Sequence, residues 1–140
     1  MYPPELTAKA QRDARYHLQL RITKVSIGDK TATASGDVVR VFRGPKEMLG
    51  QAVTTLLPCI HPGDARSPTG DSPFPTDQLR EGRILEAYFS DSEMGLSVQA
   101  GLSMLANTAS DAPRIKLINA RPPRWWQRSP LVIGIVFAAL

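Results

Sequence analysis

The chain has 140 residues, of which 42% are hydrophobic, and this is enough for one domain with a real core. Its single cysteine, Cys59, excludes an internal disulfide. The net charge of +4 belongs to the end of the chain, because the residues up to Ser110 hold twelve basic and twelve acidic side chains. The main body therefore lacks the basic excess of a nucleic-acid-binding domain, and nucleic acid is not an expected partner.

The first part of the chain predicts one short helix followed by a β-hairpin. Pro4 can begin a helix because its missing N–H would be unpaired there, and we expect the helix to end near Arg15. Residues 16–22 alternate between apolar and polar side chains, as in a half-buried strand, and the alternation slips near Lys24 as at a β-bulge. The turn residues Gly28 and Asp29 then predict a hairpin whose return strand covers residues 31–42.

The second part of the chain predicts further strands, at residues 51–60, 83–90 and 96–105, with a short last strand at 115–118. Residues 61–78 hold four prolines and two glycines without periodicity, so we expect a long loop there. Short strands with a bulged first hairpin are typical of small barrels. The predicted fold is all-β: a five-stranded OB-like barrel with a short N-terminal helix and an apolar C-terminal tail.

Side chains that could carry chemistry are few. Cys59 and His61 lie on the same side of an extended strand, and a small hydrolase that uses them is one alternative; a buried thiol followed by a loop histidine is the simpler interpretation. Two such ligands do not make a zinc site, which normally needs four. His17 falls at an outward-facing strand position, where we expect a solvated imidazole. The sequence therefore predicts no catalytic residue, no metal site and no cofactor.

The long predicted loop is the candidate contact surface for a protein partner. The spacing of its acidic residues matches no calcium loop, so we interpret them as solvated. The contact residues expected in this loop are His61, Asp64, Arg66, Asp71 and Phe74.

The last twenty residues predict a contact with a membrane. Arginines and a pair of tryptophans precede residues 131–140, which carry no polar side chain, and this order is what a membrane interface selects. Ten helical residues rise about 15 Å, about half of the hydrocarbon thickness, so the run is either the start of a longer transmembrane helix or a tail that enters one leaflet. A terminal element of the protein core is the alternative. The expected contact residues are Arg121, Arg124, Trp125, Trp126, Arg128, Leu131, Ile133 and Phe137.

Three short motifs in the body of the chain follow the pattern of one known family. The first motif, Val39–Gly44, is a strand that ends at a corner with an aliphatic, an aromatic and a basic residue followed by glycine. The second, Gly50–Val53, is a strand that follows another glycine. The third, Gly82–Tyr88, is a strand that begins with glycine and a basic residue. In these motifs residues 16–105 resemble the netrin-like and tissue-inhibitor-like OB domains of secreted and bacterial surface proteins. The N-terminal cysteine that the resemblance would use for protease inhibition is missing, so inhibition of metalloproteases is not implied.

The expected domains are a β-barrel over residues 1–113, a basic and aromatic linker over 114–130, and an apolar membrane-contact segment over 131–140. The expected function is that of a non-enzymatic, membrane-associated binding or accessory module. The alternatives are an exported netrin-like domain that binds a protein partner and, from a different class, the Cys/His hydrolase. The side of the membrane stays open, because arginines before the apolar run favour a cytosolic domain whereas the resemblance favours an exported one.

Overall fold

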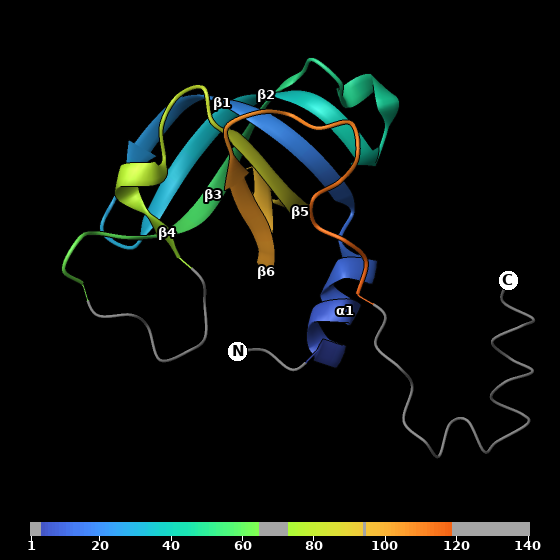
Figure 1. The fold of residues 1–140 in the computed structure, drawn as a ribbon, viewed down its shortest axis with the longest axis horizontal. Helices are drawn as coiled ribbons and strands as arrows, with labels where there is room; N and C mark the ends of the chain where they lie inside the picture. The colour runs from blue at the N-terminus through green and yellow to red at the C-terminus, as the bar shows by residue number, and fades with distance from the viewer. Residues whose placement is uncertain (1–3, 65–72, 94, 119–140) are drawn as a thin grey trace, which may run out of the picture.

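The computed structural model describes residues 4–64, 73–93 and 95–118, and it confirms the prediction of a β-rich fold with a short N-terminal helix (Figure 1). The helix ends two residues earlier than predicted, and the strands at residues 16, 31, 52, 84 and 95 begin within one residue of the prediction. In chain order the elements are α1 (Pro4–Asp13), β1 (Tyr16–Ile27), β2 (Thr31–Arg43), the 3₁₀ turn η1 (Lys46–Met48), β3 (Ala52–Ile60), β4 (Phe74–Pro75), the 3₁₀ turn η2 (Thr76–Gln78), β5 (Ile84–Ser92) and β6 (Gly95–Ala106).

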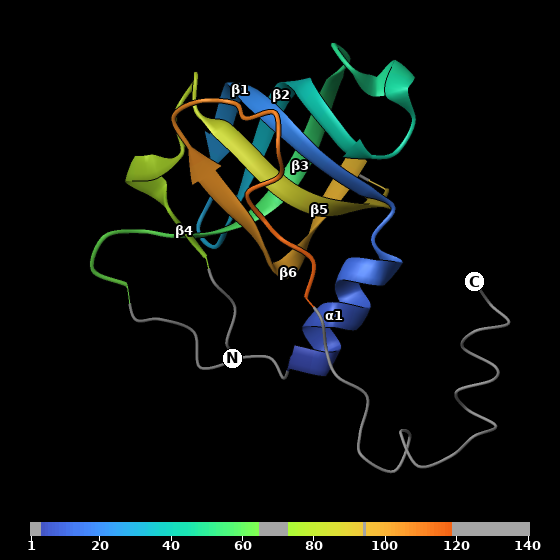
Figure 2. The ribbon, with the colours of Figure 1, turned by 45° about the vertical axis from the view of Figure 1, so that its right-hand side comes forward.

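Five of these strands close into a barrel, which confirms the predicted OB-like architecture (Figure 2). β1 pairs antiparallel with β2 and β5, β2 pairs with β3, and β5 pairs with β6. A parallel pairing of β3 with β6 completes the ring. β4 is a two-residue addition beside β3.

The barrel interior is filled by alternate residues of its strands. Leu18 and Leu20 on β1 and Leu85 and Phe89 on β5 are among its fully buried side chains. Burial of each such side chain contributes about 1.5–3 kcal/mol, so this interior is the main source of the stability of the fold.

Gly36 marks a close approach between the first two strands. A Cβ atom at this position would lie 2.6 Å from the carbonyl oxygen of Arg21, a distance that real Cβ atoms do not show. The pairing of β1 with β2 shifts register between Ile22 and Lys24, directly opposite. The slip predicted near Lys24 and the glycine in the return strand therefore belong to one irregularity, at which only glycine fits.

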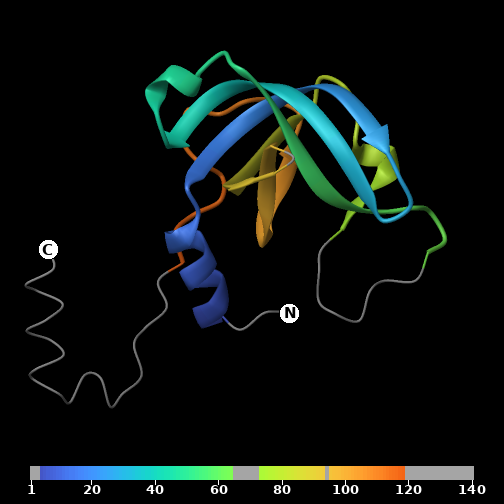
Figure 3. The ribbon, with the colours of Figure 1, turned by 180° about the vertical axis from the view of Figure 1, so that it is seen from behind.

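Residues 107–118, which follow β6 and are here named the strap, cross the outer face of β1 and β5 (Figure 2). Helix α1 lies beside the end of the strap, at one end of the barrel (Figure 3). Ala14, Tyr88 and Leu102 form a small buried cluster between the barrel and these segments, and Ile115 of the strap packs against it. The strand predicted at residues 115–118 is not formed. Glu86 of β5 binds the backbone N–H of Ile115 and Gln11 of α1 binds that of Ile118, so hydrogen bonds to the strap continue past residue 113, where the domain boundary is expected.

The two ends of the barrel carry different elements. In all three ribbon views α1 projects from one end of the barrel, and the strap descends beside it (Figures 1, 2 and 3). The 3₁₀ turn η1 and the turn at residues 80–83 lie at the opposite end. None of the helices in the described ranges is long and apolar enough to cross a membrane.

Candidate functional site

The most distinctive site is a set of buried polar side chains between the barrel and the strap. Gln11 of α1, His17 and Gln19 of β1, and Glu86 of β5 are all buried; we name them the polar clamp. The pairing of β1 with β5 sets Gln19 directly opposite Glu86, where facing side chains lie close enough to interact. Buried polar groups are costly unless they are hydrogen-bonded, so the partners of the clamp indicate its role.

Glu86 is the centre of the clamp, with 0% of its surface exposed and four donors around its carboxylate. One oxygen accepts from the side chain of Gln19 at 2.7 Å and from the backbone N–H of Arg114 at 3.0 Å. The other accepts from Nε2 of His17 at 3.0 Å and from the backbone N–H of Ile115 at 2.6 Å. Burial acts to raise the pKa of Glu86, but these hydrogen bonds outweigh it and lower the pKa below its ordinary value. The clamp therefore holds an ionised carboxylate, which binds two backbone groups of the strap.

His17 is only 4% exposed, so the prediction of a solvated histidine at this position is wrong. The alternation of β1 correctly puts His17 on the outer face of the barrel. That face is covered by other parts of the chain, which the alternation of a single strand cannot reveal. Its ring stacks on Tyr88, with 4.0 Å between the ring centroids, and contacts Phe42. Burial lowers the pKa of His17, although Glu86 acts in the opposite direction. The neutral ring then carries its proton on Nε2, because a carboxylate can only accept.

The two glutamines of the clamp bind the strap as a neighbouring strand would. Nε2 of Gln11 donates to the carbonyl of Lys116 at 2.8 Å, and its Oε1 accepts from the N–H of Ile118 at 2.8 Å. Gln19 makes a similar pair of bonds to Ser110. Three buried side chains thus hold the strap at both of its ends and in its middle.

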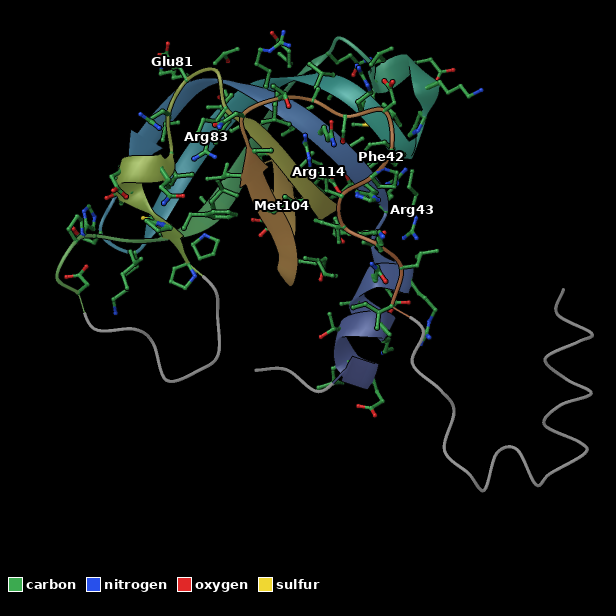
Figure 4. All side chains as sticks on the ribbon, in the orientation of Figure 1. Phe42, Arg43, Glu81, Arg83, Met104 and Arg114 are labelled. Atoms are coloured by element: carbon green, nitrogen blue, oxygen red, sulfur yellow. The ribbon has the colours of Figure 1, made fainter. Side chains whose placement is uncertain are left out.

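Arginines close the edge of the clamp. Arg43 donates from Nη1 to the carbonyls of Gln11 and Ala14, at the carboxyl end of α1 where a cation is favourable, and lies over the ring of Tyr88. Figure 4 labels Phe42, Arg43 and Arg114 in the region where the strap passes the barrel, and the side chain of Arg114 bonds to Thr108 within the strap. The arrangement is saturated with internal bonds, so its chemistry is that of a structural joint.

The sequence carried one signal for this site. Residues 84–89 read Ile-Leu-Glu-Ala-Tyr-Phe, an apolar run with a single carboxylate. A run of this kind is typical of a strand that is covered on both faces, and a lone acid inside it needs several donors. The sequence does not show which segment supplies these donors, so it does not predict that Glu86 binds the strap.

The predicted partner loop divides into parts with different surroundings. His61 bonds to the carbonyl of Gly28 at 2.7 Å, and its backbone N–H donates to the exposed Asp64. Phe74 begins β4 and packs into the barrel core at 8% exposure, so its assignment to a contact surface is wrong: it fills the barrel rather than the loop surface. Arg66 and Asp71 lie outside the described residues.

Cys59 is buried, and its thiol points to the carbonyl that His61 also contacts, that of Gly28. Burial raises the pKa of the Cys59 thiol, and Asp29 and Asp64 add to this. The uncharged thiol is a poor nucleophile, because the thiolate is the reactive form. Within the described part of the chain, no group of three or more His, Cys, Asp or Glu side chains could hold a metal ion.

The residues expected to contact a membrane all lie outside the described residues; they are Arg121, Arg124, Trp125, Trp126, Arg128, Leu131, Ile133 and Phe137. Their assignment stays a prediction. The structure describes the chain up to Ile118, three residues before the first of them.

A scan against models of protein families finds no match for this chain, and a search of curated proteins finds no significant similarity. The resemblance to netrin-like domains accordingly stays a prediction from the three motifs.

Proposed function

We propose that this chain is a non-enzymatic, membrane-associated binding or accessory module, in which the C-terminal tail attaches the barrel to a bilayer. The observation that carries the proposal is the polar clamp. It fixes the strap to the barrel at Ile115 and to α1 at Ile118, and the basic and aromatic tail begins three residues after Ile118. A domain that is joined to its anchor by so short a stretch is held close to the anchor.

The composition of the tail supports a bilayer as the attachment surface. Arg121, Arg124 and Arg128 would be attracted by anionic lipids, at about 1 kcal/mol for each arginine near the surface. Trp125 and Trp126 combine an apolar ring with an N–H that needs a partner, and such side chains favour the headgroup region.

The enzymatic alternative has less support. A Cys/His hydrolase needs an accessible thiolate, whereas Cys59 is buried with a raised pKa. The other alternative, an exported netrin-like domain that binds a protein partner, is compatible with the OB-like barrel, and it differs from our proposal in the partner rather than in the fold.

Co-sedimentation with lipid vesicles tests the proposal. The chain has only two tryptophans, both in the tail, so tryptophan fluorescence reports on the tail alone. We expect binding and a blue shift on anionic vesicles, both reduced by salt because screening weakens the attraction. The double variant Arg124→Glu with Arg128→Glu should bind less.

The matched control is Arg21→Glu with Lys24→Glu, which makes the same charge change at exposed positions of β1. This control should bind as the parent chain does. If the fluorescence is already blue-shifted without lipid and vesicles change nothing, the tail belongs to the protein core and the proposal fails.

A further inference from the structure

We infer that one particular end of the domain faces the lipid: the end formed by α1 and the last residues of the strap, here named the α1 end. The inference rests on the proposed function, because it takes the tail to be bound to a bilayer. It adds the orientation of the barrel and a second lipid-contacting surface within the folded domain, formed by Leu6, Lys9, Lys116, Leu117 and Ile118.

The first step is the point at which the chain leaves the domain. Gln11 of α1 binds both Lys116 and Ile118, so the end of the strap lies against the helix. The ribbon views show α1 projecting away from the barrel on this same side (Figures 1, 2 and 3). The described chain therefore ends beside the helix, and the opposite end of the barrel, with η1 and residues 80–83, is the most distant from this point.

The second step is the reach of the tail. Trp125 follows Ile118 by seven residues, which span at most about 25 Å when fully extended. A domain of this size is roughly 35 Å across. With the tryptophans at the headgroup level, the tether is shorter than the domain. The exit point then lies within this reach of the bilayer, which excludes an orientation with the opposite end of the barrel on the lipid and favours the α1 end.

The third step is the chemistry of the α1 end. Leu6 and Leu117 are largely exposed, Ile118 is partly exposed, and the basic side chains of Lys9 and Lys116 are exposed nearby. Single exposed leucines are common on protein surfaces and by themselves indicate nothing. Here they support a lipid contact because they lie at the end of the domain from which the tail continues. Apolar side chains with lysines around them suit an interface with anionic headgroups. The acidic Glu5 and Asp13 lie on the same helix, and Asp13 pairs with Lys9.

Depth-sensitive labelling tests the orientation. In a Cys59→Ala background, an environment-sensitive fluorophore is attached to Leu6→Cys or Leu117→Cys at the α1 end, and to Lys46→Cys or Glu81→Cys at the opposite end (Figure 4 labels Glu81). Anionic vesicles with headgroup-level quencher lipids are then added. We expect the labels at the α1 end to be quenched severalfold more strongly than those at the opposite end.

The outcomes separate this inference from the proposed function. Sedimentation with a tryptophan blue shift, but equal or weaker quenching at the α1 end, overturns the orientation and leaves the proposed function intact. Absence of both sedimentation and blue shift overturns the proposed function and, with it, the orientation.

A pair of substitutions gives an independent measurement. Leu117 is 69% exposed at the α1 end and Leu49 is 59% exposed after η1, so both accept a charge without loss of packing. Leu117→Glu should lower the vesicle partition coefficient severalfold, whereas Leu49→Glu should leave it unchanged. Equal effects of the two substitutions would contradict a specific contact at the α1 end.

Discussion

Gln19 and Ser110 are joined by two hydrogen bonds that run in opposite directions. Nε2 of Gln19 donates to the hydroxyl of Ser110 at 2.8 Å, and Oε1 of Gln19 accepts from the backbone N–H of Ser110 at 2.9 Å. The same amide also donates to Glu86. A single side chain of β1 thus connects the strap to the central carboxylate of the clamp, and the loss of either partner would leave buried polar groups unpaired.

Glu86→Gln should destabilise the domain although it hardly changes the shape of the side chain. Four donors converge on the carboxylate, and an amide nitrogen would face two of them. Because hydrogen bonds to a buried charge are costly to lose, we expect the free energy of unfolding to fall by about 3 kcal/mol. Urea unfolding followed by circular dichroism measures this change.

Glu81→Gln is the matched control for this substitution. Glu81 is exposed in the turn before β5, and its replacement should change the free energy of unfolding by less than about 0.5 kcal/mol. Equal losses in the two variants would show that Glu86 contributes only its charge and not its bonds to the strap.

Truncation should reveal the true end of the domain. A chain that ends at Ile118 keeps every bond of the clamp and should fold cooperatively without the tail. A chain that ends at Pro113 loses two donors to Glu86, both partners of Gln11 and the packing of Ile115. We expect the urea midpoint of the shorter chain to be clearly lower, and identical midpoints would place the boundary at residue 113 after all.

Acidification should weaken the fold in two stages. The pKa of His17 is lowered in the folded chain, so below its ordinary value of 6.5 the unfolded chain binds a proton that the folded chain does not, and stability falls as pH falls. The pKa of Glu86 is also lowered, so a second loss begins below its ordinary value of 4.5.

Urea midpoints between pH 7.5 and pH 3 measure both stages. His17→Gln keeps a donor for Glu86 but cannot titrate, so this variant should lose the dependence between pH 6.5 and 4.5 and retain the one below it. A midpoint of the parent chain that stays constant from pH 7.5 to 5 would be inconsistent with a neutral, buried His17.

Cys59 should react slowly with thiol reagents in the folded protein. Its side chain is buried and its pKa is raised, so both access and the thiolate fraction are low. The measurement is the rate of modification at pH 8 by a chromogenic disulfide, with Ser26→Cys as an exposed control on β1. Modification of Cys59 as fast as that of the control would revive the hydrolase alternative.

The barrel could be predicted because its information is local. The alternation of residues 16–22 and the turn at Gly28 and Asp29 specify a hairpin within one stretch of sequence. The strap could not be predicted in this way. Most of the hydrogen bonds that hold it are made by its backbone groups, which are the same in every sequence, and the side chains that bind them lie up to 107 residues away.

The large sequence separation between α1 and the strap affects folding during synthesis. Gln11 precedes its partners Lys116 and Ile118 by 105 and 107 residues, a stretch that takes about 5–20 s to synthesise. A ten-residue helix is marginal in water by itself. α1 therefore emerges from the ribosome before the other described elements, but its bonds to the strap form only after the strap has followed it out, and until then its segment stays accessible to chaperones and proteases.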